Sequence, residues 1–113
     1  MFGLRKRILI AFLLCLCTSL TVTAQSDRGT ITGIVTDSTG AVLPKASVSA
    51  TNTTKGIVSK TVTNEDGNYT IPLLPAGTYL VRVELSGFRT YIREGITVQE
   101  GESAALDVTL QNC

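Results

Sequence analysis

Strict alternation of apolar and polar residues is the feature that most constrains what this chain can fold into. In Thr78–Leu85 every second residue from Tyr79 onward is apolar, and an arginine and a glutamate lie between them. Ser103–Leu110 repeats the pattern. Successive side chains of a strand point to opposite faces, whereas a helix needs a period of 3.6 residues. No window after residue 24 sustains the helical period, so the sequence predicts strands that each have one apolar face.

Turn-forming residues divide these strands at short intervals, most clearly at Asp37–Gly40 and Asn64–Asn68. Threonine, valine and isoleucine make up 29 of the 89 residues after Ala24, and such branched side chains favour pleated sheets. A break at Glu94 and Gly95 indicates a bulge or a split into two strands. We expect about seven strands, at Thr30–Thr36, Ala46–Asn52, Ile57–Thr63, Tyr69–Ile71, Thr78–Leu85, Phe88–Val98 and Ser103–Leu110.

Two sheets must pack face to face to bury one apolar face of every strand, which predicts an all-β, immunoglobulin-like sandwich. Tyr69 and Tyr79 are expected in its core. The facing of the third strand is ambiguous, because Val58 and Val62 share a face with Lys60. The paired cysteines and the tryptophan of antibody domains are absent from the sequence.

The first 24 residues have the three-part plan of a secretory signal peptide. Basic residues at Arg5–Arg7 precede an apolar run at Ile8–Leu16, and small residues lead to a cleavage point after Ala24. The alternative is an uncleaved membrane anchor, although the run is shorter than the roughly 20 residues that a spanning helix needs. Leucines stand before Cys15 and Cys17, where a lipoprotein signal has a small residue, so we expect no lipid anchor.

The chain therefore divides into a signal peptide at 1–24, a short linker at 25–28 and one domain at 29–111. The 89 residues after the predicted cleavage point carry a net charge of −2 and one cysteine, Cys113. A single cysteine forms no internal disulfide, so a domain of this size depends on its apolar core. Cys113 is interpreted as part of a frayed terminus, with an intermolecular disulfide or a reactive thiol as the alternatives.

Composition excludes several kinds of chemistry. The chain has no histidine, so it has no histidine-dependent catalysis and no histidine-ligated metal. Its balanced charge provides no basic face for nucleic acid. Asn64–Asn68 offers oxygen ligands without the spacing of a calcium loop, and is interpreted as a solvated turn. Glu94, Glu100 and Glu102 lie at turns or strand ends as solubilising charges. We predict no enzymatic activity, no cofactor and no metal site.

Sugar binding is the alternative function that the sequence leaves open. Carbohydrate-binding platforms usually present exposed aromatic rings. Tyr91 is the best candidate, since alternation places it on the face opposite Ile92 and Ile96, and Arg89 and Arg93 flank it. These three residues, Tyr91, Arg89 and Arg93, are the candidate contacts for a ligand or a partner.

Several motifs together resemble the carboxypeptidase regulatory-like domain family. They are Gly33–Pro44 followed by Ala46–Val48, then Thr63–Tyr69, Leu74–Tyr79 and Gly87–Phe88. The resemblance spans about Gly29–Leu110, and its second half is the more specific. Lys45 departs from the small residue that the family often has at this position.

The resemblance implies a prealbumin-like, seven-stranded Greek-key sandwich, grouped with carbohydrate-binding-like folds, that acts as a non-catalytic accessory domain. Within the family, the sequence is most similar to the N-terminal extension of bacterial TonB-dependent outer-membrane receptors. The implied location is the periplasm, the outer membrane or the outside of a bacterium. The implied partners are a protein, a fused receptor barrel or a carbohydrate, with no membrane-spanning segment in the mature domain. The chain is expected to be either a stand-alone protein or a truncated receptor.

Overall fold

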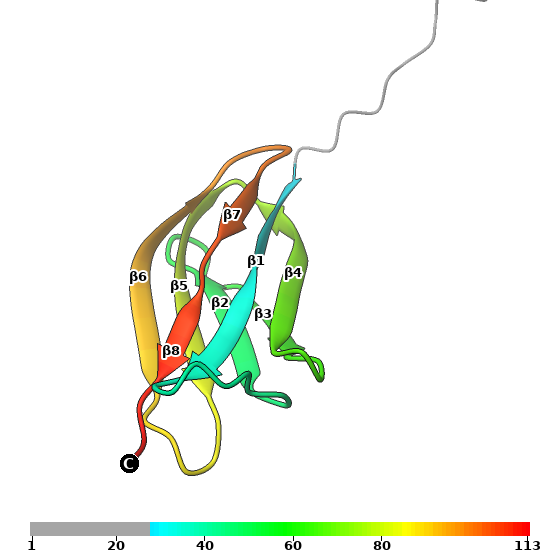
Figure 1. Cartoon of the computed structure of the whole chain (residues 1–113). Helices are drawn as coiled ribbons and strands as arrows, with labels where there is room; N and C mark the ends of the chain where they lie inside the picture. Colours follow the sequence, from blue (N-terminus) through cyan, green and yellow to red (C-terminus); the bar gives the residue numbers. More distant parts are fainter. Residues whose placement is uncertain (1–27) are drawn as a thin grey trace, which may run out of the picture.

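Two four-stranded β-sheets pack face to face in the computed structural model, which describes residues 28–113 (Figure 1). The predicted signal peptide and residues 25–27 of the predicted linker lie outside the described residues. The prediction of an all-β sandwich is confirmed. The first sheet contains β1 (Arg28–Asp37), β4 (Asn68–Pro75), β7 (Ser103–Ala105) and β8 (Val108–Leu110). The second has the order β3 (Val58–Val62), β2 (Ser47–Asn52), β5 (Gly77–Glu84) and β6 (Tyr91–Val98).

The described residues form eight strands instead of seven, because the last predicted strand is interrupted at Leu106 and Asp107. Its two halves, β7 and β8, follow one another along β1 and pair with it in parallel (Figure 1). Between them the Leu106 amide donates to the Thr32 carbonyl at 2.8 Å, and Asp107 Oδ1 accepts from the Ile34 amide at 3.2 Å. Alternation predicted which side chains face inward, but not the gap.

Tyr69 and Gly33 explain the position of this gap. The Tyr69 hydroxyl donates to the Leu106 carbonyl from inside the sandwich. Gly33 lies directly beneath, because a Cβ atom there would come within 1.9 Å of the same carbonyl oxygen. A larger residue at position 33 would therefore displace Leu106 and open the junction of β1 with the last strands.

The core lies between the sheets and takes inward residues from both. Tyr79 is 1% exposed and Tyr69 is 2% exposed, which confirms both as core residues. The Tyr79 hydroxyl donates to the Pro75 carbonyl at 2.6 Å, so its polar atom is satisfied at the rim. The aliphatic core consists of Ile31, Val35, Ala46, Val48, Ala50, Ile71, Leu74, Val81, Val83, Val98, Leu106, Val108 and Leu110.

The fourth strand is longer than its predicted range, Tyr69–Ile71, because β4 continues past Pro72 to Pro75. A proline is tolerated here because β4 is an edge strand, where one side of the backbone has no partner. Register with β1 shifts at this point, and Leu73 takes a left-handed conformation with φ of 60°. Leu73 is also 67% exposed. Pro72 therefore marks a bulge and not the end of the strand.

The predicted break at Glu94 and Gly95 is a bulge within a continuous β6. Val81 pairs with Arg93 and Tyr79 with Ile96, so Leu80 faces two residues instead of one, and Gly95 has φ of 73°. The extra residue reverses the alternation. Tyr91 and Ile96 consequently both pack against the core, while Ile92 is exposed. The predicted placement of Tyr91 opposite Ile96 was wrong, because simple alternation does not carry across a bulge.

The structure also decides the facing of β3. Val58, Lys60 and Val62 point to solvent, and Ser59 and Thr61 are half-buried on the other face. The strand thus presents its valines outward, opposite to what burial alone would favour. The β2–β3 hairpin is held instead by Asn52, a 4% exposed residue whose Oδ1 accepts from the amides of Thr54 and Lys55, both at 3.0 Å.

The turn after β1 is organised by one carboxylate. Asp37 Oδ1 accepts from the Thr39 hydroxyl at 2.6 Å and from the amides of Thr39 and Ala41 at 2.8 and 3.0 Å. These bonds stabilise the charged form, and the Thr39 hydroxyl contributes most to holding the pKa of Asp37 below its usual value. Lys45, in the next turn, has φ of 61°, a left-handed conformation that residues with a Cβ atom rarely adopt.

Substitution of Tyr79 should separate packing from hydrogen bonding. Tyr79→Ala is expected to lower the free energy of unfolding by about 3–5 kcal/mol, because it removes a buried ring. Tyr79→Phe should cost about 1 kcal/mol, because it removes only the bond to the Pro75 carbonyl. Urea unfolding measures both. A loss below about 1 kcal/mol for Tyr79→Ala would contradict the core assignment.

The Asp37 turn should make stability depend on pH. Because the pKa of Asp37 is lowered in the folded state, its contribution is fully present above the unfolded pKa, about 3.9, and is lost as pH falls through the lower, folded value. Asp37→Asn retains an oxygen acceptor but does not titrate, so this part of the pH dependence should disappear. Urea unfolding at several pH values between about 2 and 6 tests it. A pH profile that Asp37→Asn leaves unchanged would contradict this role of the Asp37 carboxylate.

Candidate functional site

The acidic and amide side chains considered as ligands have structural or solvent-facing positions. Asn64 Oδ1 accepts from the amides of Asp66 and Asn68, both at 3.0 Å, which confirms that this segment is a turn. Glu94, in the bulge, and Glu100 and Glu102, in the turn after β6, are exposed. No group of three or more His, Cys, Asp or Glu side chains able to hold a metal occurs within residues 28–113.

Tyr91 is not the exposed ring that its sequence position suggested. It is partly buried against the core, and it lies close enough to Tyr69 to affect its ionisation. Burial is the main cause of the raised pKa of Tyr69, and the nearby Asp107 and Tyr91 raise it further. The Tyr91 ring therefore packs against the core and does not form an exposed stacking platform.

Arg89 and Arg93 remain accessible. Arg89 belongs to the segment between β5 and β6, where its amide donates to the Gln111 carbonyl at 2.8 Å, and its side chain is exposed. Arg93 is exposed on β6 and pairs with Val81, just before the bulge. The structure thus places Arg93 and Tyr91 along one edge strand, with Arg89 in the loop before it.

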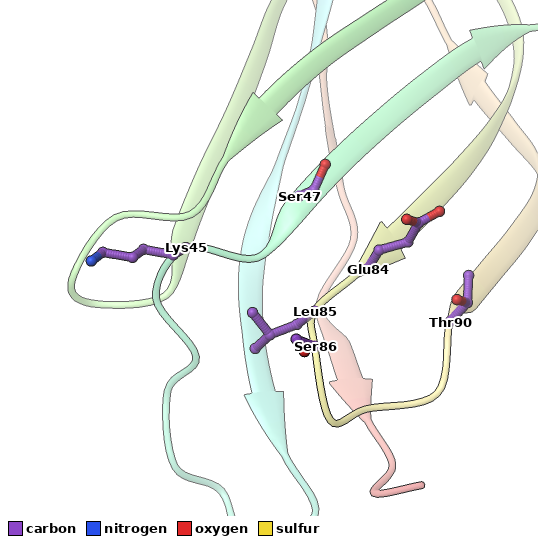
Figure 2. Close-up of a pocket in the computed structure, with 6 residues that line it drawn as sticks. All are labelled: Lys45, Ser47, Glu84, Leu85, Ser86 and Thr90. Atoms are coloured by element: carbon purple, nitrogen blue, oxygen red, sulfur yellow. The ribbon is translucent and has the colours of Figure 1, made fainter.

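A hollow of about 520 Å³ lies at one end of the second sheet (Figure 2). Figure 2 shows the Lys45 side chain pointing away from Glu84, so the two charges do not converge on one point. No sequence motif indicated this hollow, because its residues come from three separate segments that meet only in the fold. It is lined by Lys45, Ser47, Glu84, Leu85, Ser86 and Thr90.

The outer face of the second sheet combines charge with exposed apolar side chains. Arg82 and Glu84 form an ion pair on β5, and both side chains are half-exposed, so the pair adds little to stability. Val62 is 57% exposed and Val58 49% exposed at one edge of this face, while Ile92 is 53% exposed at the other. Scattered exposed residues are ordinary, but two valines on one edge strand form a defined apolar border.

Residues 30–111 match the carboxypeptidase regulatory-like domain family, and the chain belongs to that family. A curated relative is the TonB-dependent transporter Oar of Myxococcus xanthus, which is 34% identical over 89 residues. That match covers 77% of this chain but 8% of the transporter. The similarity to this TonB-dependent transporter therefore concerns one small part of a much longer protein.

Solved structures of varied function share the fold. A candidate carbohydrate binding protein from Bacteroides uniformis matches with a TM-score of 0.60 at 20% identity, over 75% of this chain and 41% of that one. The 3-chlorocatechol 1,2-dioxygenase of Rhodococcus opacus matches with a TM-score of 0.59 at 11% identity, over 81% and 63%. At these identities the matches show the fold alone. Residues 28–113 contain no helix long and apolar enough to cross a membrane.

Proposed function

We propose that the chain is an exported, non-catalytic interaction domain of the bacterial envelope, related to the N-terminal extension of TonB-dependent outer-membrane receptors. The observation that supports this most is the 34% identity to the transporter Oar over 89 residues, which is 77% of this chain. The regulatory-like family supports an accessory role. The dispersed, solvent-facing carboxylates and the absence of histidine from the sequence agree with a domain that binds through its surface.

Export is tested at the predicted cleavage point. The mature protein should begin at Gln25 and should fractionate with the periplasm or the outer membrane, because residues 1–24 have the order of a signal peptide. N-terminal sequencing and cell fractionation measure this. Ala24→Leu should slow cleavage, since the position before the cut requires a small residue. A cytoplasmic protein that retains residues 1–24 would contradict the proposal.

Carbohydrate binding is the second candidate, and the fold of the Bacteroides uniformis protein favours it. The contacts we propose for it are Arg89 and Arg93, which are exposed, together with the edge of Tyr91. A glycan array should then show reproducible binding. Arg89→Ala or Arg93→Ala should weaken this binding about tenfold or more, because each variant loses a charged hydrogen bond. Arg82→Ala, on a different face, is the control. An array with no bound glycan would leave the protein-binding role.

A further inference from the structure

The edges of the two sheets differ in whether another strand could pair with them. An edge strand exposes unpaired backbone groups, and proteins usually block such edges with proline, bulges, charge or short strands. Within residues 28–113, β4 carries Pro72 and the bulge at Leu73, and β6 carries a bulge beside two charged residues, Arg93 and Glu94. The edge formed by β7 and β8 is broken at Leu106.

The β3 edge has neither a proline nor a bulge. Its register with β2 is regular from Val62 opposite Ser47 to Val58 opposite Thr51. Lys60, at its centre, is the single charged residue of the strand. In this respect β3 differs from the other edges of the described fold, since it retains an uninterrupted row of backbone groups along its length.

The hydrogen bonds to β2 show which backbone groups of β3 are free. The Asn52 amide donates to the Ile57 carbonyl at 2.9 Å, and the Thr63 amide donates to the Ala46 carbonyl at 3.0 Å. Bonded and non-bonded residues alternate along an antiparallel pair. The odd-numbered residues of β3 therefore bond to β2, and the backbone groups of Val58, Lys60 and Val62 point away from the sheet.

The side chains of the same three residues set the chemistry of a strand that would pair there. Val58 and Val62 are exposed apolar residues on either side of the exposed Lys60. Side chains directly opposite each other across an antiparallel pair interact, and like charges in that position repel. The complementary strand places an acidic residue opposite Lys60 and apolar residues opposite the two valines.

A second copy of this chain fits the edge poorly. When two β3 strands pair about a two-fold axis at full overlap, Lys60 faces Lys60 of the other copy. Shifting the register to avoid this contact shortens the pairing and leaves one valine without a partner. Lys60 thus acts against self-association while leaving the edge available to an acidic segment.

We propose that β3 is a docking edge that takes up an extended polypeptide segment by strand addition, and that the segment carries apolar, acidic and apolar residues at alternate positions. This rests on the proposed role as an interaction domain and specifies its surface and its partner. Main-chain hydrogen bonds at Val58, Lys60 and Val62 supply the attachment, and the outward side chains supply the selectivity.

A synthetic peptide tests the proposal directly. The probe is a capped peptide of about seven residues in which valine, glutamate and valine alternate with threonine, and the comparison peptide has lysine in place of the glutamate. In an NMR titration at low salt, the glutamate peptide should bind the protein at least about threefold more tightly. Bound peptide should slow hydrogen exchange of the Val58, Lys60 and Val62 amides.

Two variants of Lys60 locate the effect. Lys60→Glu should reverse the preference between the two peptides. Lys60→Pro removes an outward amide without removing a bond to β2, so both peptides should lose binding while the chain stays folded. If the proline variant unfolds, Lys60→Glu still provides the test. Lys45→Glu, which makes the same charge change at an exposed turn residue outside β3, is the matched control and should keep the wild-type preference.

Three results would overturn the docking edge. They are equal binding of the two peptides, exchange protection that maps to another strand, and a dimer of this chain that Lys60→Pro dissociates in sedimentation experiments. None of them alters the N-terminal sequence or the cell fraction of the mature protein. Failure of the docking edge can therefore be distinguished from failure of the proposed envelope role.

Discussion

The hydrogen bond from the Tyr69 hydroxyl to the Leu106 carbonyl is the interaction on which the rest of the sandwich depends. It joins the inside of β4 to the gap between β7 and β8, and it requires Gly33 on β1 to have no side chain. Strands β1 and β4 and the junction of β7 with β8 thereby meet at one buried polar contact. Because a buried carbonyl without a partner is costly, this contact favours one arrangement of the last strands along β1.

The most distinctive surface of the described residues is the edge of a sheet. Three edges are interrupted by a proline, a bulge or a broken strand, and β3 is continuous. The outward valines of β3 cost the fold some burial that a reversed strand would recover.

Much of the fold follows from local sequence. The alternation in β5 located the strand to within a residue at each end, and the turn at Asn64 lies where its amide and acidic residues predicted it. The candidate site was harder to predict. Tyr91 packs inward because the bulge at Gly95 reverses the alternation of β6, and the hollow near Lys45 unites residues far apart in the chain. Neither effect is visible in a short window of sequence.

The sequence by itself determined the class of fold, the core tyrosines and the chemistries that a chain without histidine excludes. These depend on side-chain period and residue type, which are local properties. Only the tertiary structure decided the gap between β7 and β8, the facing of β3 and the burial of Tyr91. Each of these depends on a partner in another strand. The gap forms where the Leu106 carbonyl accepts from Tyr69, and the facing of β3 follows from its pairing with β2. Tyr91 is partly buried because the bulge in β6 turns its ring toward the core.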